Sequence, residues 1–166
     1  MKRSGIASLL LSTLLLTGCL YSLSGGGGLP RNVRSVAVIP FENETATPEL
    51  TGELHQALRK AFGDRLGLRD ATEEKANAVV HGKITSYEAD VPIAFSADPN
   101  RATSARRRLQ IRVDVTIEDR TTGRILFERS GVSAEGDYAE REEASGRKQA
   151  IQRIVNDIVE GAQSQW

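Results

Sequence analysis

Apolar and polar residues alternate most clearly between residues 109 and 118 of the chain. The apolar positions recur at every second residue, and charged or polar residues fill the positions between them; the apolar residues are Leu109, Ile111, Val113, Val115 and Ile117. Side chains on a strand point alternately to its two faces, so this pattern predicts a strand with one buried face. The sheet that contains it should therefore have one covered and one open face.

Four other segments are predicted to be strands: 33–41, 66–69, 78–95 and 124–133. The first is apolar at nearly every position from Val36 onward, which is typical of a central strand. In the third, Val80 and Ile84 lie on one face, while His81 and Tyr87 fall on the more polar face. The last follows the turn sequence DRTTG, residues 119–123.

Two segments show apolar stripes at the helical period. The first helix is predicted to begin with Thr47 as N-cap and Pro48 as its first residue, and to end at Gly67. The second begins near Glu140. Their stripes are Leu50, Leu54, Ala57, Leu58, Ala61 and Phe62, and Ile151, Ile154, Val155, Ile158, Val159 and Ala162. The element order β-α-β-β-β-α predicts an α/β (α+β) fold, a two-layer sandwich in which a mixed sheet carries both helices on one face.

The N-terminus has the pattern of a bacterial lipoprotein signal. Lys2 and Arg3 precede a short apolar run over 6–16, as in a secretory signal. A helix that crosses a membrane takes about 20 apolar residues, so this run is too short to be one. It ends in LTGC, residues 16–19, which is the leucine, small, small, cysteine order of a lipobox. We therefore predict that Cys19, the single cysteine, carries the lipid.

This processing divides the chain into three parts. We predict a signal peptide over 1–18, a lipidated Cys19 with a glycine-rich tether up to residue 32, and one domain over 33–166. Two or more acyl chains on Cys19 would anchor the protein stably. Leu20, rather than an aspartate, follows the cysteine, which indicates the periplasmic face of the outer membrane.

Composition and motifs exclude several functions. Lysines and arginines number 22, as do aspartates and glutamates, so the chain lacks the basic excess of a nucleic-acid-binding protein. The sequence has no nucleophile elbow, phosphate-binding loop or paired metal-ligand spacing. Its two histidines, His55 and His81, are expected at surface or boundary positions. We predict no enzymatic activity, cofactor or metal.

A group of arginines precedes and enters the strand of clearest alternation. Arg106, Arg108 and Arg112 share the face opposite the apolar residues, and Arg101 lies in the preceding loop. At about 3.3 Å per residue, the three strand arginines span roughly 20 Å. Guanidinium groups bind phosphate through a planar fork of donors. This face is therefore either a solvated or protein-contact surface, or a binding site for an anionic lipid.

Three stretches of the chain resemble one protein family. The run CLYSLSG…LPRNVRSVAVIPFENET, followed by ANAVVHGKITSY and DRTTGRILFE, is similar to the lipopolysaccharide (LPS)-assembly lipoprotein family, LptE. Leu20 stands where the family often has glycine before the tyrosine. The resemblance implies a sandwich of this element order in an outer-membrane lipoprotein that plugs the LPS-translocon β-barrel LptD, helps it assemble and binds LPS. It also implies that the open sheet face and the loop before the fourth strand are contact surfaces.

Other envelope lipoproteins share the combination of a lipobox and a strand ending in VAVIPFEN. They include adaptors that activate peptidoglycan synthases and the curli-secretion group, and an activator is the alternative interpretation. Such an activator usually has a longer linker than the one before residue 33. An envelope hydrolase is a third class, which the missing pair of nucleophile and base disfavours.

Overall fold

The computed structural model describes residues 29–30, 32–94, 106–139 and 141–164. Within them the chain forms two helices and six strands, which matches the predicted order apart from one additional two-residue strand. In chain order the elements are β1 (Ser35–Val38), β2 (Glu42–Asn43), α2 (Glu49–Leu66), β3 (Arg69–Asp70), β4 (Ala78–Ala94), β5 (Arg106–Asp119), β6 (Arg124–Tyr138) and α3 (Glu143–Ser164).

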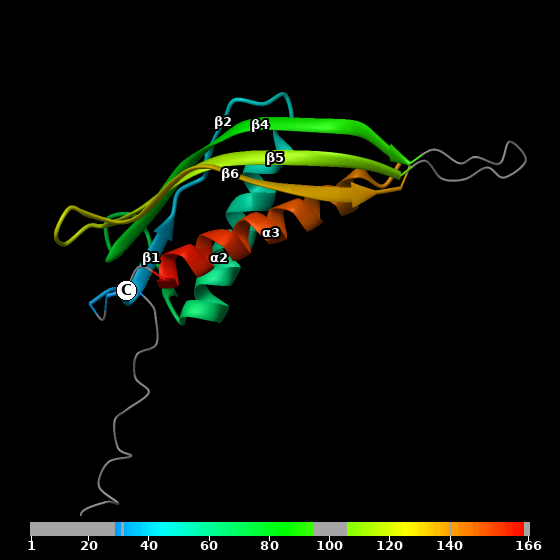
Figure 1. Cartoon of the computed structure of the whole chain (residues 1–166). Helices are drawn as coiled ribbons and strands as arrows, with labels where there is room; N and C mark the ends of the chain where they lie inside the picture. Colours follow the sequence, from blue (N-terminus) through cyan, green and yellow to red (C-terminus); the bar gives the residue numbers. More distant parts are fainter. Residues whose placement is uncertain (1–28, 31, 95–105, 140, 165–166) are drawn as a thin grey trace, which may run out of the picture.

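The strands form one mixed sheet, as predicted. Its order is β3-β1-β4-β5-β6, and β2 pairs with β4 beyond the end of β1. β1 runs parallel to both β3 and β4, whereas β5 runs antiparallel to both of its neighbours, β4 and β6. The three long strands continue well past β1 and form an arm (Figure 1).

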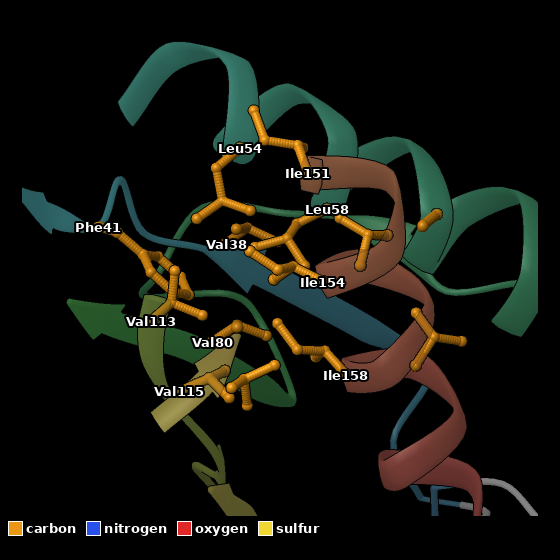
Figure 2. Packing of buried hydrophobic residues seen from close by; sticks show 14 of the residues in the cluster. Val38, Phe41, Leu54, Leu58, Val80, Val113, Val115, Ile151, Ile154 and Ile158 are labelled. Atoms are coloured by element: carbon orange, nitrogen blue, oxygen red, sulfur yellow. The ribbon is translucent and has the colours of Figure 1, made fainter. Parts of the chain in front are cut away.

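Both helices cover the same face of this sheet, which confirms the two-layer prediction (Figure 1). The alternating apolar residues of β5 are all buried beneath the helices. The six residues of the predicted α3 stripe are buried as well. Figure 2 shows Leu54 and Leu58 of α2 and Ile151, Ile154 and Ile158 of α3 pointing into one cluster with residues of β1, β4 and β5. Burial of these side chains stabilises the fold. Among the described helices, neither is long and apolar enough to cross a membrane.

Several predicted boundaries are displaced. The strand predicted over 33–41 is β1, Ser35–Val38, and the one predicted over 66–69 is β3, Arg69–Asp70, because α2 continues to Leu66. α2 begins at Glu49, and the residue before it is Pro48, not Thr47. The backbone carbonyl of Thr47 accepts from the N–H of Leu50 and from the side-chain amide of Asn43, and no side-chain hydrogen bond caps the start of the helix. At its other end, Gly67 closes α2 as predicted, with a φ of 65° that favours glycine.

β6 extends five residues beyond the predicted end at Ser133, and α3 begins at Glu143 instead of near Glu140. The extension depends on Gly136. A Cβ on that residue would lie 1.9 Å from the carbonyl oxygen of Gly146 in α3. Two glycines thus let the start of α3 lie directly against β6, and this tertiary contact sustains the strand.

Candidate functional site

The open face of the sheet carries the predicted arginines. Arg106 and Arg112 are exposed and Arg108 is half-buried, while Leu109 and Ile111 between them are buried on the helix side. The predicted separation of the two faces is therefore confirmed. Arg101 and Cys19, the other predicted site residues, lie outside the described residues.

Arg108 is held by two carboxylates from the neighbouring strand. Its Nε donates to Oδ1 of Asp137 at 2.8 Å, and its Nη1 lies 3.0 Å from Oε2 of Glu135. The hydrogen bond from Arg108 holds the pKa of the Asp137 carboxyl below its usual range. The same bond raises the pKa of Arg108 itself. Its charge is largely neutralised within the sheet.

Arg112 lies in a different environment on the same face. Its cross-strand neighbours are Ser86 of β4 and Ser133 of β6, neither of which carries charge. Neither Arg112 nor Arg106 forms an ion pair with another residue that the structure describes. Of the three predicted arginines, Arg112 is therefore the most available to an anionic ligand, since the charge of Arg106 also acts on Asp137.

A shallow hollow of about 350 Å³ lies on the same open face, nearer β2. Lys83, on its wall, lies 3.0 Å from a carboxylate oxygen of Glu44 and 3.7 Å from one of Glu42, and the bond to Glu44 raises the pKa of its ammonium group. His81, also on the wall, is exposed, as predicted. In the described parts of the chain, no three histidine, cysteine or acidic residues come together as a possible metal site.

The other histidine has a structural contact. His55 of α2 is partly buried, and its Nε2 lies 3.0 Å from the backbone carbonyl oxygen of Val38. This contact joins α2 to the end of β1. It agrees with the boundary position predicted for His55.

Tyr87 was wrongly predicted to share the polar face with His81. A register irregularity between Ile84 and Ser86 shifts the alternation by one residue, so that Tyr87 pairs with Ile111 on the helix side. Its hydroxyl donates to Oε1 of Glu143 in α3. Burial, followed by this hydrogen bond, raises the pKa of Tyr87.

Glu143 and Tyr87 belong to a cluster that joins three elements. Arg147 of α3 binds Glu53 of α2 at 2.9 Å from Nη2 and 3.3 Å from Nε, and its Nη1 lies 3.4 Å from Glu143. The Arg147 side chain is only 15% exposed, and its bond to Glu53 raises its pKa. The cluster fixes the start of α3 against α2 and β4.

Sequence reasoning missed Glu135 and Asp137 as partners of Arg108, because it ended the strand at Ser133. Every second residue of a strand lies on the same face, and Ser133 pairs with Arg112. Glu135 and Asp137 therefore also lie on the arginine face. In the Arg147 cluster, only the pair of Glu143 and Arg147 has a sequence signal, because the two residues are four positions apart on α3. Glu53 and Tyr87 are distant in sequence and join this pair only through packing of α2 and β4 against α3.

Comparison with protein families gives one assignment. The LptE family, described as lipopolysaccharide-assembly, matches residues 33–161. The chain belongs to the LptE family. The match spans the chain from before β1 to near the end of α3, so it includes the whole sheet, its open face and both helices. Comparison with curated proteins finds no similar sequence.

Solved structures share the fold of this LptE-family chain at low sequence identity. PelC from Paraburkholderia phytofirmans, crystallised as a dodecamer, is 15% identical with a TM-score of 0.53, over 83% of this chain and 93% of that one. Protein XCC0632 from Xanthomonas campestris is 10% identical with a TM-score of 0.54, over 83% and 91% of the two chains. These likenesses show a common fold, and family membership comes from the sequence match alone.

Proposed function

We propose that this protein is an outer-membrane lipoprotein that plugs an LptD-like β-barrel, helps it assemble and binds LPS while the lipid passes to the outer leaflet. The family match over residues 33–161 is the observation that carries this proposal. The protein acts by binding and positioning, without catalysis or a cofactor.

The covalent lipid places the domain at the membrane. After removal of residues 1–18, Cys19 is the acylated first residue, on the periplasmic face of the outer membrane, and residues up to 32 form its tether. The domain over 33–166 is then held close to a barrel in the same membrane.

The open sheet face supplies the contact surface for LPS. Arg112 and Arg106 present guanidinium groups to which phosphates of the lipid bind. Arg108 contributes less, because Asp137 and Glu135 already bind it. Arg101, which precedes β5 in the sequence, is proposed to extend the same surface.

Affinity capture tests the partner. The tagged full-length protein is isolated from detergent-solubilised outer membranes, and the bound proteins are identified by mass spectrometry. We expect a large outer-membrane β-barrel in near-stoichiometric amount. A Cys19→Ala variant serves as the control, because without a lipid anchor it should reach the barrel poorly.

Recovery of a peptidoglycan synthase without a barrel would contradict the proposal and favour the alternative, a synthase-activating adaptor. The same capture from total envelopes detects either partner, whichever membrane holds it.

A further inference from the structure

A groove of about 640 Å³ lies between α2 and α3, on the helix layer and away from the arginine face. It falls within the range of volumes typical of small-molecule sites. None of its residues takes part in the contacts assigned to the open face.

Two interhelical bridges bound this groove. Arg147 binds Glu53 at one end, and Arg65 donates to Oδ1 of Asn156 at 2.8 Å at the other. Between the bridges, Ala57 and Ala61 of α2 contribute only methyl groups to the lining of the groove. The helices are thus held together at two points, and small side chains leave the space between them unfilled.

The length of the groove bears on what it can hold. From Glu53 to Arg65, α2 rises about 18 Å. The groove is therefore long enough to accommodate one extended chain along α2.

Its lining is that of an amphiphile site. Ala57, Ala61 and Ile151 form an apolar floor, and the side chains of Lys60 and Lys148 lie along the rim. Long lysine stems add methylene groups to such a floor while their ammonium groups stay in water. Lys60 pairs with Asp64, whereas Lys148 is exposed and forms no ion pair with the described residues. The rim thus holds one uncompensated cation.

We propose that this groove holds one acyl chain of LPS, with an anionic group of the lipid beside Lys148. The choice of LPS rests on the proposed function, whereas the acyl-chain chemistry rests on the groove itself. The arginine face and the groove lie on opposite sides of the sheet. The proposal therefore gives the protein a second contact with the lipid, through its hydrocarbon instead of its phosphates.

The test uses the purified mature domain and the fluorescent fatty acid 11-(dansylamino)undecanoic acid. We expect saturable binding that an Ala57→Leu variant weakens about tenfold, because the larger side chain fills the groove. Ala46→Leu is the matched control, since Ala46 is exposed and lies outside the groove. Equal binding by the two variants overturns the proposal.

The charge is tested separately. Lys148→Glu should weaken binding of the anionic probe several-fold and leave competition by neutral dodecanol unchanged, while Lys75→Glu, at an exposed site elsewhere, should change neither. The same loss in both lysine variants would show only non-specific attraction and contradict the proposal.

Displacement of the probe identifies the lipid. Purified lipid A should compete better than phosphatidylglycerol, and a preference for phosphatidylglycerol overturns LPS as the occupant. This result is independent of the barrel capture. If no barrel is captured but lipid A still binds, the proposed plug is refuted and the groove proposal stands. If a barrel is captured but lipid A does not bind, only the groove proposal is refuted.

Discussion

Two arginines in this protein each lie between two carboxylates, yet their environments differ. Arg147 lies in the helix layer and Arg108 on the open sheet face. The carboxylates are Glu53 and Glu143 for the first, and Glu135 and Asp137 for the second. The Arg147 side chain is 15% exposed and that of Arg108 is 36% exposed. Water therefore screens the second group far more than the first.

The two arginine–carboxylate groups also connect different elements of the fold. Arg147 joins α3 to α2 and, through Glu143, to Tyr87 of β4. Arg108 joins only β5 and β6, which the backbone ladder already holds together. The same residue types therefore stabilise tertiary structure in one place and adjust surface charge in the other.

The largest expected effect is that of Arg147→Ala. Because it leaves Glu53 and Glu143 without their shared cation and frees the start of α3, we expect the free energy of unfolding to fall by about 2 kcal/mol. Urea titration monitored by circular dichroism measures this loss. Arg59→Ala, which removes an exposed ion pair with Asp70, is the control and should change stability little. Equal losses of unfolding free energy in Arg147→Ala and Arg59→Ala would show that the Arg147 group stabilises the protein no more than an exposed ion pair does.

Tyr87→Phe should lower stability by about 1 kcal/mol at neutral pH, because the hydrogen bond to Glu143 is lost. Burial and Glu143 raise the pKa of Tyr87, so the folded state favours its neutral form. This contribution is present below the pKa of an unfolded tyrosine, about 10, and is lost as the pH rises above it. The loss of stability with rising pH should therefore be smaller in the variant than in the unmodified protein. Identical dependence of stability on pH in the two proteins would contradict the hydrogen bond between the Tyr87 hydroxyl and Glu143.

Arg112→Ala should weaken LPS binding at low salt about fivefold, since an uncompensated cation near an anionic surface is lost. Arg108→Ala should weaken it less, because Asp137 and Glu135 already bind that side chain. Surface plasmon resonance with immobilised LPS at two salt concentrations compares them. A larger effect of Arg108→Ala would reverse the assignment of the two residues.

The smallest effect is that of Arg108→Ala on stability, which should be a small loss at pH 7 that disappears in acid. Arg108 depresses the folded-state pKa of Asp137, so this contribution is present above the unfolded pKa of about 4 and is lost as the pH falls through the folded value. Thermal melting from neutral to acidic pH should show weaker acid destabilisation in the variant. An unchanged profile would show that Arg108 does not affect the pKa of Asp137.

Alternation and helical periodicity alone determined most of the fold. They identified both helices, the buried face of β5 and the two-layer arrangement, because each depends on which side of a single element is apolar. They also placed Arg106, Arg108 and Arg112 on one face, which follows from the period of two within one strand.

Only the tertiary structure decided what those residues contact. The irregularity before Ser86 turned Tyr87 toward α3, and the contact of Gly136 with Gly146 extended β6 far enough to bring Asp137 beside Arg108. The groove between α2 and α3 depends in the same way on how two distant helices approach each other. Local patterns set the face of each side chain, whereas register and helix packing set its neighbours, because those depend on the free energy of the whole assembled core.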